Sequence, residues 1–303
     1  MTYYQRSKLE STVFDTVNLL LMVLIMFITF YPFWNTIAVS FNVAADTTRG
    51  GITFWPRVFT LQNYRAVFAT GTIYNAFGIS VARTVIQTVS GVFLTSMLAF
   101  ALSRKNFVFR KPFTLILVLS MYVNAGLIPN YFLIRSLGMI NTFWVYIVPG
   151  MISAFNFIVI RTYMANLPDS IIESARIDGC GDFIIFIRII LPLCLPVLAT
   201  IALFIAVGAW NSWFDTMIYN SGRVYLHTLQ YKLMEYLQSS QNQARSAAQI
   251  GAMGMAQDAA ASMVTPVSIR AAITVVAAMP ILVVYPFLQR YFVAGISLGS
   301  IKE

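Results

Sequence analysis

Three acidic side chains surround a short apolar stripe in residues 165–190, and this combination suits docking to another protein better than catalysis. The acidic residues are Glu173, Asp178 and Asp182. The stripe is formed by Ile171, Ile172, Ala175 and Ile177, apolar residues in a short segment that is expected to be helical. Because water does not tolerate such a face without a partner, we predict a short helix, a glycine turn at Gly179 and a second helix that together fit a socket on another protein.

One cationic side chain, Arg83, interrupts a long uncharged run of the chain. Counting from Tyr74 at about 1.5 Å per residue places it roughly 13–14 Å along a helix, near the middle of a bilayer core of about 30 Å. An arginine facing lipid there is unfavourable, so Arg83 should face the helix bundle or a water-filled cavity. Two interpretations stay open. It either bonds a backbone carbonyl or a side chain such as Asn124 or Asn156, with no carboxylate expected at that depth, or it lines a path for a solute.

The remaining reactive side chains do not form a catalytic or metal-binding pattern. His227 is the sole histidine, and no cysteine pair lies at ligand spacing from it. Cys180 and Cys194 fall in a cytoplasmic loop and a membrane helix, where disulfides are not expected. No Ser-His-Asp order, glycine-rich phosphate loop or close pair of carboxylates is present. We therefore predict no catalytic residue, no metal and no cofactor bound by this chain.

The composition places these residues in a membrane protein. Of 303 residues, 58% are apolar and 10% are charged, and the mean hydropathy is +0.74. A soluble domain of this composition would expose too much apolar surface, and the few scattered charges do not form the basic face of a nucleic-acid-binding protein. The net charge of +9 is better interpreted through membrane topology.

Six stretches are long and apolar enough to cross a bilayer as helices. Near-continuous apolar runs do not fit a β-barrel, and the first run is too long for a signal peptide. We predict an all-α membrane protein with a single transmembrane domain over residues 1–303 and helices at about 14–39, 74–102, 112–134, 142–164, 189–214 and 270–291.

The distribution of basic residues predicts the orientation of the chain. With the N-terminus inside, the cytoplasmic segments hold 11 Lys and Arg in 63 residues, against 8 in 97 residues outside. Because basic residues favour the cytoplasmic side, both termini, the Arg104–Lys111 loop and the 165–190 loop are predicted to be cytoplasmic. The segment 215–269 is then external.

The external segment has two parts. Gly222–Leu237 carries tyrosines with Lys232 and Glu235, as an interfacial helix does. Ser239–Ser262 is rich in Ala, Gln, Ser, Gly and Met, which is compatible with either a mobile loop or a small-residue helix against a partner.

The 165–190 loop also carries a family signature. Permease subunits of binding-protein-dependent ATP-driven importers have Glu-Ala-Ala, three residues, Gly, nine residues, Ile, one residue and Leu-Pro. This chain has Glu173-Ser174-Ala175, then Gly179, then Ile189 and Leu191-Pro192. Ser174 is the one departure, a small residue for a small residue. The chain resembles this family over nearly its whole length.

Further segments resemble the carbohydrate branch of the maltose-permease type. They include Trp55-Pro56, Ala99-Phe-Ala-Leu-Ser-Arg104, Ala209-Trp-Asn-Ser-Trp213 and Tyr285-Pro-Phe-Leu-Gln289. Within that branch the chain is most similar to permeases for oligosaccharides released from complex polysaccharides.

The resemblance implies the type I importer permease fold, in a multi-pass subunit of the bacterial inner membrane. It implies four kinds of contact: a second, homologous permease, two cytoplasmic ATPase subunits that use ATP and Mg²⁺, an external sugar-binding protein, and membrane lipid, with no nucleic acid. The residues implied to couple to the ATPase are Glu173, Ser174, Ala175, Asp178, Gly179, Ile189, Leu191 and Pro192.

The resemblance also gives candidates for the sugar path, because aromatic faces suit sugar rings and amides suit hydroxyls. They are Arg83, Asn124, Asn156, Trp210, Asn211 and Trp213. For the tryptophans the alternative is packing at the membrane interface, and for the amides it is contact between helices. A permease for a non-sugar solute and a channel are the rival functions, although no filter-like repeat or charged ring is visible.

Overall fold

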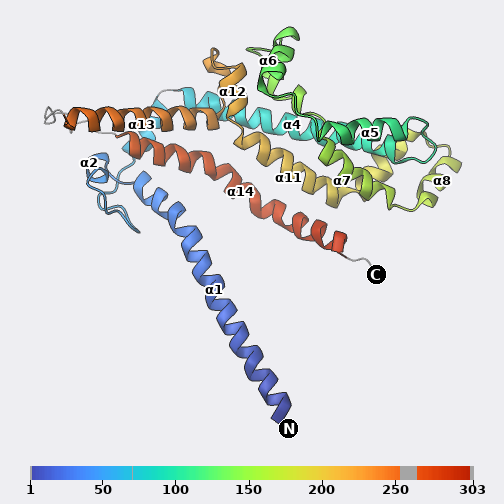
Figure 1. Ribbon diagram of the computed structural model, residues 1–303, viewed down its shortest axis with the longest axis horizontal. Coiled ribbons are helices and arrows are strands. Elements are labelled where there is room, and N and C mark those ends of the chain that lie inside the picture. Colours follow the sequence, from blue (N-terminus) through green and yellow to red (C-terminus); the bar gives the residue numbers. More distant parts are fainter. Residues whose placement is uncertain (1, 70, 253–264, 301–303) are drawn as a thin grey trace. The chain divides into compact units, whose positions relative to one another are not determined.

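The computed structural model describes residues 2–69, 71–252 and 265–300, and these residues are helical apart from loops and one isolated bridge between Asn42 and Phe59. The all-α prediction is confirmed. The chain forms two compact units: Met1–Thr70 with Glu235–Ala277, and Gly71–Met234 with Ala278–Glu303. Figure 1 shows the elements of both units.

The first unit opens with a long exposed helix. Its N-terminal elements are α1 (Thr2–Ser40), α2 (Ala44–Thr47) and α3 (Gln62–Ala69). Side chains from Ser11 to Phe33 are all exposed, as expected for a helix whose apolar surface is covered by lipid or by a partner. The turn after α1 is fixed by Asn63, whose amide donates to the carbonyls of Ser40 and Asn42, both at 2.9 Å.

The second unit holds most of the helices. In chain order they are α4 (Thr72–Ser103), α5 (Arg110–Ser120), α6 (Leu127–Ser136), η1 (Phe143–Tyr146), η2 (Val148–Gly150), α7 (Ala154–Ala165), α8 (Asp169–Ile177), α9 (Asp182–Ile185), the π-helix η3 (Phe186–Ile190), α10 (Leu191–Leu193), α11 (Leu195–Asn211), α12 (Phe214–Tyr219) and η4 (Val224–Leu226). Two further helices, α13 (Leu229–Ala252) and α14 (Pro266–Ser300), divide between the units.

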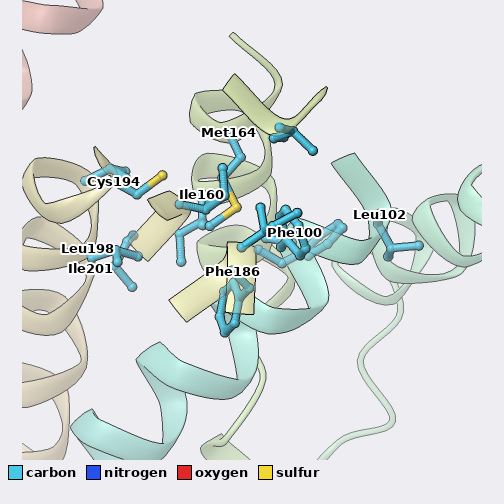
Figure 2. Close-up of a cluster of buried hydrophobic side chains, with 14 of the residues drawn as sticks. Phe100, Leu102, Ile160, Met164, Phe186, Cys194, Leu198 and Ile201 are labelled. Atoms are coloured by element: carbon cyan, nitrogen blue, oxygen red, sulfur yellow. The ribbon is translucent and has the colours of Figure 1, made fainter. Parts of the chain in front are cut away.

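The core of the second unit lies where α4 packs against α7 and α11, which run beside it (Figure 1). Gly91 permits this close approach, because a Cβ there would lie 3.2 Å from Cδ1 of Ile205 on α11. Figure 2 shows the buried cluster at one end of these helices, with labelled members Phe100, Leu102, Ile160, Met164, Phe186, Cys194, Leu198 and Ile201.

Membrane-crossing candidates can be counted only in the described residues. Three helices there are long and apolar enough, Ser11–Ser40, Thr72–Ser103 and Val267–Val284, and the number rises to five if each of two bent pairs is one span. The pairs are Phe143–Gly150 with Ala154–Ala165, bent by 47°, and Asp182–Leu193 with Leu195–Asn211, bent by 83°.

The prediction of a continuous helix over 112–134 is wrong. Two short helices, α5 and α6, replace it. The break occurs where the side-chain carbonyl of Asn124 accepts the N–H of Gly126 at 2.9 Å and Gly126 takes a φ of +85°. A side chain that bonds nearby backbone competes with the helix, and Gly126, with its positive φ, is the cap at which α6 begins.

The helices predicted over 142–164 and 189–214 are also not continuous. In the second of these, Pro192 and Pro196 each lack the N–H that an α-helix needs, and the 83° bend falls between them at Cys194. The apolar runs were identified correctly, but their length did not reveal the breaks.

Much of the segment after α12 is helical, although its composition was equally compatible with a mobile loop. Helix α13 begins at Leu229, whose N–H donates to the hydroxyl of Ser80 on α4 at 2.8 Å, and continues to Ala252. This favours the small-residue helix over the mobile loop up to that residue. Residues 253–264 of the same segment lie outside the described part of the chain.

Candidate functional site

Helix α8 ends in a glycine turn that the sequence predicted. Gly179 has a φ of +80°, its N–H donates to the carbonyl of Arg176 at 3.0 Å, and the N–H of Cys180 donates to that of Ala175 at 3.0 Å. This pair of bonds is the Schellman motif, which requires a left-handed residue at this position. The turn leads into α9, whose Ile185 is buried in the same core cluster as Ile172 and Ala175 of α8.

The apolar stripe of α8 does not form one exposed face, contrary to the prediction. Ile172 and Ala175 are buried in the core cluster with Phe157 and Met164 of α7, whereas Ile177 is 86% exposed. The stripe therefore has two uses: its inner residues attach the helix to this chain, and Ile177 remains on the surface beside exposed Glu173 and Ser174. Helical geometry explains the difference, because at about 100° per residue Ile177 lies about 160° around the helix axis from Ala175.

Ion pairs hold the start of α8 against the loop after α4. The ammonium of Lys105 lies 2.9 Å from the carboxylate of Asp169, and the guanidinium of Arg104 lies 3.8 Å from it. The hydrogen bond and charge of Lys105 lower the pKa of the Asp169 carboxyl. We call Arg104, Lys105 and Asp169 the basic clamp. Sequence analysis missed it, although an acidic residue at a helix start and a basic loop were both visible.

The rest of the signature leads from α9 into the bent helix. Ile189 and Leu191 are half-buried and Pro192 is exposed, in the stretch of π-helix and α10 that precedes the 83° bend. Asp178 is exposed at the end of α8. The signature residues thus lie partly on the exposed side of α8 and partly on the half-buried stretch before the bend.

Arg83 has a carboxylate partner, which corrects the prediction. Its guanidinium forms an ion pair with Asp215 of α12 and donates to the carbonyl of Ser212 at 3.3 Å. Asp215 also accepts the hydroxyl of Ser212 at 2.8 Å. The sequence prediction places Asp215 in the external segment, whereas in the structure Asp215 of α12 is paired with Arg83 of α4. The proposed partners Asn124 and Asn156 are not bonded to Arg83.

The ion pair lines a cavity that we call the polar cavity, because Arg83, Gln87, Asn130 and Asp215 are among its otherwise mostly apolar lining residues. Arg83 is 3% exposed, Asp215 is 35% exposed, and the Cζ of Arg83 lies 4.7 Å from the ring centre of Tyr146. The cavity has a volume of about 550 Å³ and is also lined by Gln87 and Asn130. Within the described residues, the buried atoms Nε of Arg83 and Oε1 of Gln87 have no hydrogen-bond partner.

The other path candidates do not gather at this cavity. Trp210 is buried, packs edge to face on Phe77 at 6.0 Å and lines a separate apolar cavity of about 210 Å³. Trp213 packs on Phe214 at 5.8 Å, and Asn211 donates to a carbonyl of its own helix at 3.0 Å. Asn156 is buried at the start of α7. Of the predicted set, only Arg83 lines the polar cavity.

These features define the class of the protein. It is an all-helical membrane protein in which a surface helix, α8, is packed on one side against the core. A transport subunit that is moved by another protein requires such a helix. Residues 91–298 match the family of binding-protein-dependent transport system inner membrane components. The chain belongs to this family. The family confirms the predicted permease subunit of an ATP-driven importer, a non-catalytic membrane component.

Similar proteins cover almost the whole chain. The polygalacturonan/rhamnogalacturonan transport system permease protein YtcP of Bacillus subtilis (strain 168) is 34% identical over 97% of this chain and 100% of its own length. Protein LplC of the same organism is 36% identical over 96% and 95%. A solved structure, a bacterial ABC transporter involved in the import of the acidic polysaccharide alginate, matches with a TM-score of 0.81 and 25% identity over 93% of this chain and 97% of that one.

Proposed function

We propose that the chain pairs with a second, homologous permease and that the two form the path by which an oligosaccharide enters the cell. An external sugar-binding protein delivers the substrate, and two cytoplasmic ATPase subunits supply the energy from ATP and Mg²⁺. The substrate class is supported by similar proteins named for polygalacturonan or rhamnogalacturonan, arabinooligosaccharides and alginate.

Helix α8 is the contact through which the ATPase moves this chain. The observation that carries this step is the division of α8 into a core-packed side with Ile172 and Ala175 and an outer side with Ile177. A helix fastened on one side transmits a push from the other as rigid-body motion, because packed interiors deform little. Glu173 and Ile177 dock on the ATPase, and the basic clamp and the turn at Gly179 keep α8 in place.

The topology that fits this function has six spans with both termini and α8 in the cytoplasm of a bacterium. Basic residues of the loop between α4 and α5 support the orientation. In this arrangement the chain is one transmembrane domain of the inner membrane and binds no cofactor, because nucleotide chemistry belongs to the ATPase subunits.

The polar cavity beside Arg83 is the part of the chain most suited to the substrate path. Arg83, Gln87 and Asn130 offer donors and acceptors for sugar hydroxyls. Asp215 compensates the charge of Arg83, so the pair contributes hydrogen bonds and does not attract acidic sugars by net charge. Trp210, Trp213, Asn211, Asn124 and Asn156 contribute walls or packing.

Purification of the native complex tests the proposal. An affinity-tagged chain is isolated from its own membranes, and the co-purifying proteins and transported solutes are identified. We expect a homologous permease and a nucleotide-hydrolysing subunit, with ATP hydrolysis stimulated by an oligosaccharide-loaded binding protein. Stimulation only by a non-sugar solute would refute the substrate class, and isolation without an ATPase would favour a channel.

A further inference from the structure

A groove lined by four cations lies beside the basic clamp and shares Lys105 with it. It has a volume of about 750 Å³ and lies between the loop after α4, the beginning of α5 and the side of α7. Its cations are Lys105, Arg110, Lys111 and Arg161, and no carboxylate is among its lining residues in the described part of the chain. We call these four residues and their cavity the basic groove.

Of the four cations, only Lys105 has its charge balanced by a carboxylate of the protein. Lys105 pairs with Asp169. Arg161 donates from Nε to the carbonyl of Leu102 at 3.0 Å, which fixes its guanidinium and leaves the terminal nitrogens for another acceptor. Within the described residues, Arg110, Lys111 and Arg161 have no ion-pair partner. The three unpaired cations repel one another unless an anion joins them.

The other wall of the same groove is apolar. It includes Phe107, Val108, Leu115 and Val118. Val108 and Leu115 are among the exposed large apolar side chains, and Leu115 is on α5 one turn beyond Lys111. A free phosphate ion would use the cations and leave this wall bare, whereas a molecule with an anionic head and an apolar tail would use both.

We propose that the basic groove binds an anionic phospholipid of the surrounding membrane. The phosphate is held by Arg110, Lys111 and Arg161, and an acyl chain lies along Leu115 and Val118. In the proposed topology the groove lies at the cytoplasmic end of the membrane helices, where a basic pocket is the usual setting for an anionic headgroup. A phospholipid is favoured over a soluble protein partner because the apolar wall continues along a helix surface rich in exposed apolar side chains, including Ile116 and Leu119.

The test measures lipid preference in the complete transporter complex, with its ATPase subunits bound, in detergent micelles. Binding of fluorescent phosphatidylglycerol is competed with unlabelled phosphatidylglycerol, phosphatidylcholine or inorganic phosphate. We expect phosphatidylglycerol to compete and the other two to fail. Lys111→Gln should weaken the preference for phosphatidylglycerol about fivefold, and Arg110→Gln with Lys111→Gln should weaken it about fivefold again.

The matched control removes two exposed cations elsewhere, by Arg135→Gln with Arg223→Gln, and should leave the preference unchanged. Equal competition by inorganic phosphate would overturn the proposal in favour of a free-anion site. No preference in the complete complex would overturn it in favour of an ATPase contact that covers the groove. An equal loss in the control double variant would assign the preference to overall charge, which also overturns it.

Discussion

Arg83 on α4 and Asp215 on α12 are 132 residues apart in the chain and form an ion pair in which the arginine is almost fully buried. The pair joins the middle of a membrane helix to the segment that follows α11. It also compensates a charge that would otherwise be unfavourable inside a membrane protein.

Breaking the pair from one side should destabilise the protein. We expect Asp215→Asn to lower the free energy of unfolding by about 2 kcal/mol, because the guanidinium of Arg83 is then left buried without a counter-charge. Arg83→Gln with Asp215→Asn should recover part of that loss. Thermal unfolding of the purified complex measures both, and Arg223→Gln is the control for removing an exposed cation. Additive losses in the double variant would contradict an energetic coupling.

Arg83 should also affect transport. In Arg83→Gln the cavity loses donors, so we expect a lower transport rate per complex, similar for neutral and acidic oligosaccharides because Asp215 already balances the charge. Uptake in proteoliposomes, normalised to the amount of assembled complex, measures this. If the rate per complex stays normal while the complex becomes less stable, Arg83 has a structural role only.

Substitutions of glycine in the turn after α8 should act through backbone conformation and not through a lack of space for the new side chain. No atom lies within 4 Å of a Cβ built at Gly179 or at Gly181, but only Gly179 has a positive φ. We expect Gly179→Val to strain the turn by roughly 1–2 kcal/mol and to uncouple substrate-stimulated ATP hydrolysis. Gly179→Asn should be milder, and Gly181→Ala should be nearly neutral. Equal effects at both glycines would refute this explanation.

The two sides of α8 should respond differently to substitution. Ile172→Ala removes a buried side chain from the core cluster and should cost about 2–5 kcal/mol of stability. Ile177→Ala removes an exposed one and should change stability by less than about 0.5 kcal/mol while weakening the ATPase contact. Glu173→Lys should likewise weaken that contact through charge reversal. Unfolding and co-purification assays on the same preparations separate the two outcomes.

The basic clamp should weaken in acid. Lys105 lowers the pKa of Asp169 below its ordinary 3.8, so the folded state favours the charged carboxylate. The resulting stabilisation is present above about pH 3.8 and is lost as the pH falls through the lowered pKa. The protection factors of the α8 amides, which compare their hydrogen exchange with the intrinsic rate at the same pH, should therefore fall in that range. Asp169→Asn should exchange faster at neutral pH and lose this pH dependence; an unchanged profile in the variant would exclude the clamp as its cause.

The sequence predicted what depends on local chemistry. The end of α8 follows from Gly179, because a left-handed residue at that point needs glycine whatever surrounds it. The apolar runs of α1, α4 and α14 were likewise long enough to be recognised. These features depend on a few neighbouring residues or on the length of one apolar run.

What the sequence did not reveal depends on contacts between distant residues. Ile172 is buried because it packs in the same core cluster as residues of α7, and Asp215 pairs with Arg83 although 132 residues separate them. The breaks near Gly126 and Cys194 had local signals in Asn124, Pro192 and Pro196, but counting uncharged residues ignores them. Composition predicts that a stretch enters the membrane, and it does not predict a straight helix.

Crosslinking from α8 tests the central claim most directly. A photoreactive amino acid is placed at Ile177, or at the similarly exposed apolar residue Ile128 of α6 as the control, and the complete transporter is irradiated in membranes. If α8 couples the permease to the ATPase, the Ile177 derivative forms an adduct with the ATPase subunit, and the yield of this adduct changes when ATP is added. The Ile128 derivative forms no such adduct. An ATPase adduct from Ile128 and none from Ile177 would contradict the account.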